Sequence, residues 1–224
     1  MKWNAPQWTL RPAVLCLAVL FAATSLCAAA DKPAPDKIFQ EMLKQSLKLK
    51  DYTFKFDHSE INAKTKKEEH TVCDFLWKEP DYRKLTVNEG QHKGSIVVYN
   101  PDKSKTKVFG KQGGMEIPGG MPKDTKMVEP FFKVGWQNDL MELKKLTRDG
   151  KFTLDGEDTV KGRKAWKITV TGAKDKYDKI IIWVDQKEKV LMRHEYYIKG
   201  KFDSGTVIYD IKVNPGLKSD VFKP

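Results

Sequence analysis

The sequence predicts an α+β protein whose structure is mainly antiparallel β. Apolar residues alternate with polar residues in many short segments, which is the spacing of strands that bury one face. Only two segments show the three- and four-residue apolar spacing of a one-sided helix. Gly, Pro, Asn and Asp separate the alternating segments at short intervals, and such short turns join antiparallel neighbours.

Residues 1–30 predict a cleavable secretory signal peptide. Lys2 and Arg11 precede an apolar run, Ala13–Leu26, and small residues follow it. This run is shorter than the roughly 20 apolar residues that a membrane-spanning helix needs. The alanines that end at Ala30 are the small side chains that a signal peptidase reads. We therefore expect residues 31–224 to fold as one exported domain in the periplasm.

The chain is strongly basic, with 41 Lys and Arg against 30 Asp and Glu. In an exported protein this charge favours an anionic membrane or envelope surface over nucleic acid, and a merely solvated lysine-rich surface is the other interpretation. Of the three cysteines only Cys73 lies beyond the signal peptide, so the mature chain cannot form an intramolecular disulfide. Stability must come from the core, and we expect a monomer without a cofactor.

The first half of the domain predicts one helix and then a series of strands. A helix is expected over residues 35–50, where one side carries Ile38, Phe39, Met42, Leu43 and Leu47. From Asp51 the period changes to two, which predicts strands around Phe54 and Phe56 and at 72–77, 82–88, 95–100 and 105–109. In 72–77 the aromatic side chains and Cys73 share one face.

The middle of the chain interrupts this alternation. Residues 110–126 contain too much Gly and Pro for a central strand, so a long mobile connection is expected there. A second amphipathic helix is expected over 128–146, with Pro130 near its start.

Strands are expected again at 151–155, 163–171, 179–185, 191–199 and 206–213. Trp166, Ile168 and Val170 should share one face, as should Val207, Tyr209, Ile211 and Val213. The run Ile180–Val184 is apolar on both faces, which predicts a strand in the middle of the sheet.

Several stretches resemble the LolA-like superfamily of periplasmic outer-membrane lipoprotein carriers, in the divergent branch of predicted lipoprotein-sorting proteins. They are Leu76-Trp77-Lys78-Glu79-Pro80-Asp81-Tyr82-Arg83, Val97-Val98-Tyr99-Asn100-Pro101, Ile182-Trp183-Val184-Asp185, Glu195-Tyr196-Tyr197, Val207-Ile208-Tyr209-Asp210-Ile211 and Asn214–Phe222. The family pattern has an arginine directly before the proline of the first stretch, and this chain has Glu79 there. The resemblance therefore supports the family's fold and apolar cavity more strongly than its cycle of cargo release and transfer.

The resemblance implies a curved, half-open β-barrel with helices on its concave face, enclosing an apolar cavity for acyl chains. It implies a non-catalytic carrier or sensor of lipids or lipoproteins, with a role in transport during outer-membrane biogenesis. The expected cavity wall comprises Phe54, Phe56, Phe75, Trp77, Trp166, Ile168, Trp183 and Tyr209, and the expected lid comprises Met115, Ile117, Met121, Phe131 and Phe132. Each of these residues has ordinary core packing as its alternative.

Other functions have weaker support in the sequence. Met115, Met121 and Met127 recur every six residues and would suit copper(I), but three thioethers alone make a weak site. His70 and Cys73 have the spacing of a metal-ligand pair, but on a strand they should point to opposite faces and could not bind one ion. Hydrolase and phosphate-binding signatures are absent from the sequence, although a triad assembled in space stays open. An envelope protein-interaction module with a self-filled cavity is the main alternative to a carrier.

We expect N-terminal sequencing of the exported protein to begin at Asp31, because cleavage after Ala30 removes the apolar segment. Intact mass spectrometry checks the same point. Lipid attachment at Cys27 is not expected, because Leu26 occupies the position where that processing needs a small residue. A mass carrying acyl chains on Cys27 would contradict this prediction.

Overall fold

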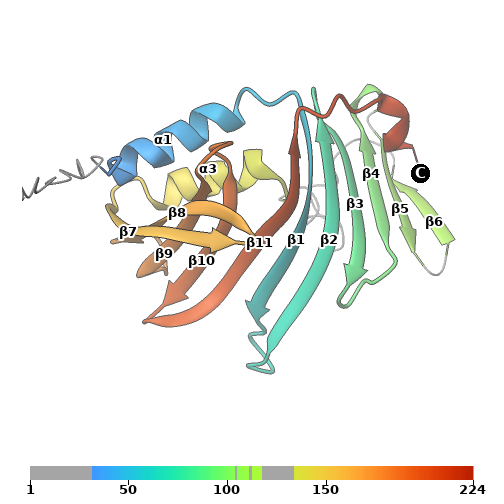
Figure 1. Cartoon of the computed structure of the whole chain (residues 1–224). Coiled ribbons are helices and arrows are strands. Elements are labelled where there is room, and N and C mark those ends of the chain that lie inside the picture. The colour runs from blue at the N-terminus through green and yellow to red at the C-terminus, as the bar shows by residue number, and fades with distance from the viewer. Residues whose placement is uncertain (1–31, 104, 111–112, 118–133, 224) are drawn as a thin grey trace, which may run out of the picture. The chain divides into compact units, whose positions relative to one another are not determined.

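The fold is built on an antiparallel sheet whose eleven strands follow the order β6-β5-β4-β3-β2-β1-β11-β10-β9-β8-β7 (Figure 1). The structure is a computed structural model that describes residues 32–103, 105–110, 113–117 and 134–223. In chain order the described elements are α1 (Pro35–Ser46), β1 (Asp51–Ile61), β2 (Glu68–Lys78), β3 (Tyr82–Glu89), β4 (Ile96–Asn100), η1 (Pro101–Lys103), β5 (Lys105–Gly110), β6 (Gly113–Ile117), α3 (Trp136–Leu146), β7 (Lys151–Val160), β8 (Arg163–Thr171), β9 (Lys179–Asp185), β10 (Leu191–Ile198), β11 (Lys201–Val213) and η2 (Ser219–Phe222).

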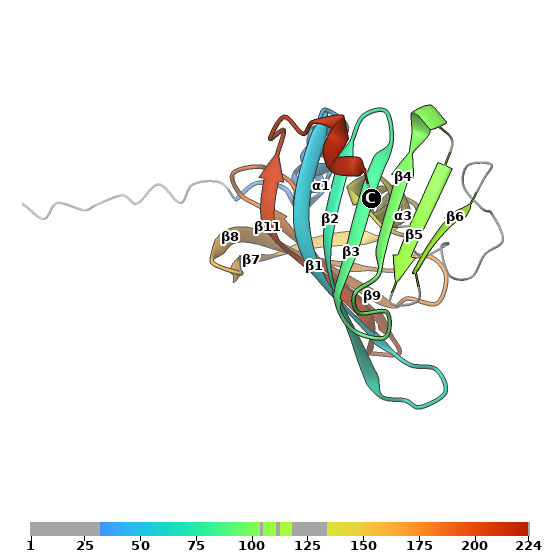
Figure 2. The same cartoon turned by 90° about the vertical axis from the view of Figure 1, so that its right-hand side faces the viewer.

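Two meanders meet at the centre of this sheet. Strands β1 to β6 step outward to one edge, and strands β7 to β11 step inward from the other edge. The meanders join where β1 pairs with β11, with Phe56 opposite Ile208. In the described part of the chain β6 and β7 are the edges and do not pair with each other, so the sheet stays open (Figures 1 and 2). The expected half-open antiparallel barrel is confirmed.

One face of the sheet, called the inner face from here on, carries the main apolar core. Strict alternation along β1 and β2 places Phe54 opposite Phe75, and Tyr52 opposite Trp77, on this face. In the other meander, β8 and β9 contribute Ile168, Val170, Ile180 and Ile182 to the same core, and these four residues have no exposed surface. The predicted shared face of Trp166, Ile168 and Val170 is confirmed, since all three belong to or pack against this core.

The two described helices cover the inner face. α1 buries Ile38, Phe39 and Met42, and the ring of Phe39 lies 5.2 Å from that of Phe152 on β7. α3 buries Trp136, Leu140, Leu143 and Leu146. Neither helix combines the length and the apolar character needed to cross a bilayer.

The opposite, outer face carries two smaller apolar clusters. One comprises Val160, Ala165, Ile181, Trp183 and Met192, and the other comprises Tyr82, Val98 and Phe222 of η2. The first cluster covers the outer side of β9, so the run Ile180–Val184 is buried on both faces as the sequence predicts.

The expected common face of Val207, Tyr209, Ile211 and Val213 is wrong. The register between β1 and β11 shifts, because Thr53 faces Lys212 whereas Lys55 faces Tyr209. Asp210, with a φ of 52°, supplies the extra residue of a bulge. An extra residue moves all later side chains to the other face, so Val207 packs on the outer cluster and Val213 on the inner core.

Several predicted boundaries also differ from the structure: β7 ends at Val160 instead of residue 155, and β11 begins at Lys201 instead of residue 206. The first helix ends at Ser46 instead of residue 50, which leaves Leu47 78% exposed. Residues 113–117, expected within a connection, form β6, and an edge position tolerates their glycines. The second helix begins at Trp136, after Val134 and Gly135, and the earlier part of the expected helix, residues 128–133, lies outside the described residues.

Replacing Leu143 by Ala should lower the free energy of unfolding by about 2–5 kcal/mol, because this α3 side chain is fully buried on the inner face. Urea denaturation measures the effect. Met141 lies on the same helix and is 68% exposed, so Met141→Ala should change stability by less than about 0.5 kcal/mol. Equal losses in the two variants would show that α3 does not pack through this face.

Candidate functional site

An aromatic platform on β1 and β2 forms the floor of the candidate site. It consists of Tyr52, Phe54, Phe75 and Trp77, which alternate with outward-facing residues on the two strands. The ring centroids of Tyr52 and Trp77 are 5.2 Å apart, and those of Phe54 and Phe75 are 5.3 Å apart. These separations are typical of favourable ring contacts, so the four side chains form one continuous apolar surface.

Trp136 of α3 covers this platform. Its ring lies 4.7 Å from the ring of Tyr52 and 5.2 Å from that of Phe54, and its side chain has no exposed surface. The indole Nε1 donates a hydrogen bond to the carbonyl oxygen of Leu191 at 3.1 Å. The platform is therefore occupied by the protein's own helix in this structure.

Gly135 brings the start of α3 close to the platform. Its φ is 116°, and a Cβ built on it would lie 3.0 Å from both the Phe75 ring and the Tyr52 hydroxyl. A side chain at this position would therefore push α3 away from the sheet. Polar contacts also tie this end of the helix to the sheet: the Tyr52 hydroxyl donates to Oε1 of Gln137, and Nη1 of Arg83 donates to the carbonyl of Val134 at 3.4 Å.

Arg83 stands at the rim of the platform in a buried polar network. Its Nε lies 2.7 Å from Oδ1 of Asp81, and the indole of Trp77 donates to the same oxygen at 3.2 Å. These contacts compensate the burial of the guanidinium, which is necessary for a charge with so little exposed surface. Arg83 thus connects the β2–β3 hairpin, where Glu79 precedes the proline, to the segment that leads into α3.

Asp139 places an acidic group beside the platform. Removal from water raises the pKa of its partly buried carboxyl group to about 8, and the charge of Glu142 adds to this effect. Burial also raises the pKa of Tyr52 and of Tyr196, and the Asp139 charge contributes to both shifts. At neutral pH the carboxyl group is largely protonated, which keeps the interior beside Trp136 uncharged.

A row of polar side chains crosses the inner face at β1, β11 and β10. Nδ1 of His58 lies 3.0 Å from Oγ1 of Thr206, and Thr206 is paired with His194. Burial lowers the pKa of His194 to about 3, and His58 contributes by repulsion. The buried Nδ1 atom of His194 has no hydrogen-bond partner among the described residues. This row is therefore neutral at pH 7 and breaks an otherwise apolar surface.

The structure places the predicted cavity residues on both faces of the sheet. Phe54, Phe56, Phe75, Trp77 and Ile168 are buried on the inner face, and Trp166 packs against them. Trp183 belongs to the outer cluster instead, and Tyr209 faces outward because of the register of β11. These two positions are corrections to the expected wall.

The predicted lid falls largely on residues that the structure does not describe. Met121, Phe131 and Phe132 lie outside the described residues. Met115 and Ile117 belong to the edge strand β6, where their backbones pair with Val108 and Thr106. Sequence reasoning missed Trp136, Arg83, Asp139 and His194 as site residues. Of these, Trp136 had a signal, since it heads the apolar stripe of the second helix.

One histidine does lie within hydrogen-bond reach of a serine. Oγ of Ser59 is 3.0 Å from Nδ1 of His70, and Nε2 of His70 is 3.4 Å from a carboxylate oxygen of Glu68. The His70 side chain is 55% exposed, and Ser59 pairs with neighbours on both sides of β1. Its strand amides are thus engaged in the sheet and cannot form an oxyanion hole. We interpret this cluster as solvated surface hydrogen bonding.

Within the described residues, neither Cys73 nor any group of potential metal ligands forms a reactive site. Burial raises the pKa of the Cys73 thiol to about 12, which suppresses the nucleophilic thiolate. As predicted, Cys73 and His70 lie on opposite faces of β2. Across the described residues no three His, Cys, Asp or Glu side chains are grouped so that they could hold a metal ion.

Comparison with known proteins agrees with this architecture. A family model described as "Uncharacterized protein" matches residues 134–202, and no curated protein matches the sequence significantly. Lipoprotein LppX of Mycobacterium tuberculosis is 15% identical, with 83% of this chain and 99% of that chain covered and a TM-score of 0.51. In the Pseudomonas aeruginosa MucA/MucB complex the match is 11% identical, covers 85% of this chain and 60% of that chain, and has a TM-score of 0.52.

A LolA superfamily protein from Nitrosomonas europaea is also similar, with 13% identity, coverage of 86% of this chain and 99% of that chain, and a TM-score of 0.39. At such identities the comparisons show the fold alone. This chain therefore shares its overall fold with the LppX and MucB structures.

Asp139→Asn should remove a pH dependence of stability. The unfolded carboxyl ionises near pH 4, whereas the folded carboxyl holds its proton to about pH 8, so wild-type stability should fall as pH rises between these values. The variant should match the wild type at pH 4 and exceed it by at least about 1 kcal/mol at pH 9. Urea unfolding across this range measures the difference. A constant difference at all pH values would contradict the raised pKa.

Proposed function

We propose that this protein is an exported, non-catalytic carrier or sensor that binds acyl chains of lipids or lipoproteins on the aromatic platform of the inner face. The supporting observation is the continuous apolar surface of Tyr52, Phe54, Phe75 and Trp77, covered by one helix that packs mainly through apolar side chains. The LolA-like fold and the signal peptide expected over residues 1–30 agree with a site in the periplasm.

In this proposal the acyl chain replaces α3 on the platform. Transfer of a chain of about sixteen carbons from water gains roughly 12 kcal/mol in gross terms, which alone would make release slow. The acyl chain must first displace Trp136 and its helix, which cover the same apolar surface. The net binding free energy is therefore the gain from burying the acyl chain minus the cost of displacing α3. Exchange of one cover for the other makes binding reversible.

The structure has the features that such a displacement needs. Gly135 provides a backbone pivot directly before α3, and the contacts of the helix with the sheet are mostly apolar. Apolar contacts are non-directional, so an acyl chain can take them over. On opening, the Tyr52 hydroxyl and the Leu191 carbonyl each lose a hydrogen-bond partner, and each group left buried and unpaired costs about 1–3 kcal/mol, which the apolar exchange must offset.

The filled interior also favours a second candidate, an envelope protein-interaction module that never opens. Tyr52, Phe75 and Trp136 have no exposed surface, which is the packing expected of a permanent core. One solved structure with the same fold, that of Pseudomonas aeruginosa MucA and MucB, is a complex of two proteins. The two candidates differ in whether lipid enters when α3 is weakened.

We expect native mass spectrometry of the gently purified protein to detect bound lipid, and we expect uptake of a fluorescent fatty acid. Trp136→Ala should bind the fatty acid at least about tenfold more tightly, because the platform loses its competing cover. Met141→Ala on the exposed side of α3 is the control and should bind like the wild type. Circular dichroism confirms that each variant is folded. Absence of lipid and of uptake in all three proteins would reject the carrier and favour the interaction module.

A further inference from the structure

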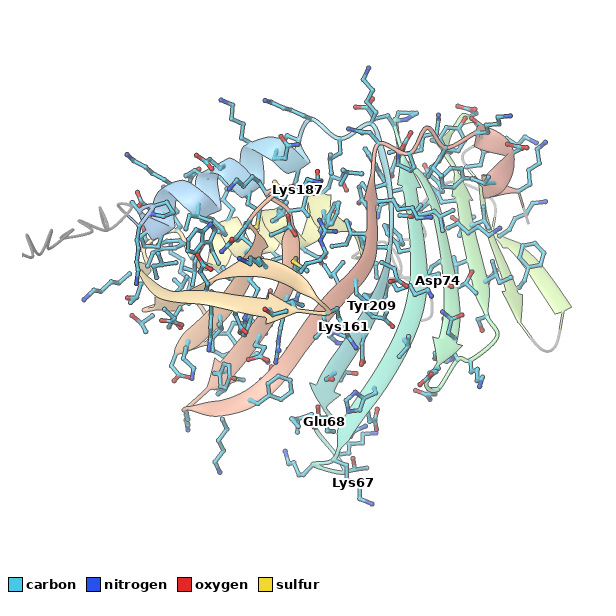
Figure 3. All side chains as sticks on the ribbon, in the orientation of Figure 1. Lys67, Glu68, Asp74, Lys161, Lys187 and Tyr209 are labelled. Carbon is cyan, nitrogen blue, oxygen red and sulfur yellow. The ribbon has the colours of Figure 1, made fainter. Side chains whose placement is uncertain are left out.

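A groove of about 880 Å³ runs along the sheet, and most of its lining residues, though not Phe54 and Phe75, have side chains on the face opposite the aromatic platform. Its floor comes from β11, β1, β2 and β3, and it is flanked by the β7–β8 turn and by η2. The lining residues are Thr53, Phe54, Lys55, Asp74, Phe75, Leu76, Lys84, Thr86, Lys161, Arg163, Asp210, Ile211, Lys212 and Val221. Figure 3 shows Lys161 and Tyr209 close together at one side of this region, with Asp74 on β2, which β1 separates from β11.

The groove carries a strong excess of positive charge. Five of its lining side chains are cationic and two are carboxylates. Both carboxylates are already engaged, because Asp210 lies 3.2 Å from Nζ of Lys55 and Asp74 accepts a hydrogen bond from Asn88. With Lys55 paired to Asp210 and Arg163 paired to Asp185, three lysines (Lys84, Lys161 and Lys212) face one carboxylate, Asp74, so the groove keeps a net positive charge that an anionic partner would offset.

The remaining cations are held in defined positions. Lys161 has a φ of 46° and forms a two-residue hairpin turn with Gly162, and its Nζ lies 4.9 Å from the centre of the Tyr209 ring. Nε of Arg163 lies 2.9 Å from the buried Asp185. Lys84 donates to the neutral carbonyl of Val221 at 3.1 Å and keeps its charge. Across the described residues neither Lys161 nor Lys212 has a carboxylate partner.

We propose that this groove binds an extended, acidic polypeptide segment of a partner protein. Lys212, Thr53, Leu76 and Lys84 occupy one cross-strand row. Three strand steps of about 4.8 Å separate the two lysines by about 14 Å, which an extended chain spans in about four residues. Acidic side chains at both ends of such a segment would meet Lys212 and Lys161 at one side and Lys84 at the other.

The shape of the groove favours a peptide over a bilayer. The cations lie along the floor and the flanks of an open depression, where an extended segment can reach the cations at both ends. Leu76, Ile211 and Val221 add apolar surface, and Thr53 and Thr86 add hydroxyl groups that can bind a peptide backbone. The cations of the groove lie outside the proposed acyl site, so this proposal does not depend on lipid binding.

The test measures binding of the full exported protein to fluorescent peptides by anisotropy. A twelve-residue peptide of alternating Glu and Thr should bind, its Gln-Thr counterpart should not, and raising salt from about 0.05 to 0.5 M should weaken binding. Lys161→Glu/Lys212→Glu should weaken binding at least about tenfold, and Lys161→Gln/Lys212→Gln should have an intermediate effect.

Lys64→Glu/Lys187→Glu is the matched control, because it changes the net charge equally at two lysines outside the groove. This variant should bind the acidic peptide within about twofold of the wild type, and this limit includes the effect of the changed net charge. An equal loss in the control and groove variants would overturn the proposal. The proposal would also be overturned if the acidic peptide did not bind folded wild-type protein. Binding of anionic phosphatidylglycerol vesicles through Lys161 and Lys212, without binding of the peptide, would be one form of that outcome.

Discussion

The pairing of β1 with β11 determines most other features of this structure. They are the first and last strands of the described chain, and their register extends from Tyr52 opposite Val213 to Glu60 opposite Ser204. Without this pairing the two meanders would be separate sheets, each with an unprotected edge at its inner end. With it, the inner faces of both meanders become one surface, and α1 and α3 can cover it together. The last segment of the chain reinforces the same junction, because Asp51 accepts hydrogen bonds from the amides of Gly216 and Leu217.

The chain path explains why a helix lies over the aromatic platform. After β6 at one edge, the chain must return to β7 at the opposite edge, and α3 lies on this crossing. A segment that crosses an apolar sheet face buries its own apolar side, as Trp136 and Leu143 do. The same element therefore completes the core and blocks the surface that an acyl chain would use. In the proposed carrier, acyl-chain binding would be an exchange of one apolar cover for another, and its strength would depend on how firmly α3 is held.

The two faces of the sheet have different chemistry. Apart from the Arg83–Asp81 ion pair at its rim, the inner face carries ionisable groups that are mainly neutral: Asp139 is largely protonated at neutral pH, and burial lowers the pKa values of His58 and His194. The outer face keeps its charges exposed and collects lysines around a groove. Alternation along the central strands produces both surfaces at once, because neighbours such as Phe54 and Lys55 point to opposite sides. One protein can in this way present an apolar site and an electrostatic site without interference between them.

Local sequence determined the elements and much of the core. The spacing of Phe54 with Phe56, and of Cys73 with Phe75 and Trp77, predicted which side chains share a face of their strand, because the period is two; the strand pairing decided that these faces point inward. The apolar run Ile180–Val184 likewise indicated a central strand. Only the tertiary structure decided where Tyr209 and Trp183 point, since the bulge at Asp210 and the cover over β9 depend on pairing between distant strands. The same holds for the shifted pKa values of Asp139 and His194 and for the groove that brings Lys84, Lys161 and Lys212 together. Burial and charge proximity arise from contacts between residues far apart in the chain, and no local pattern encodes them.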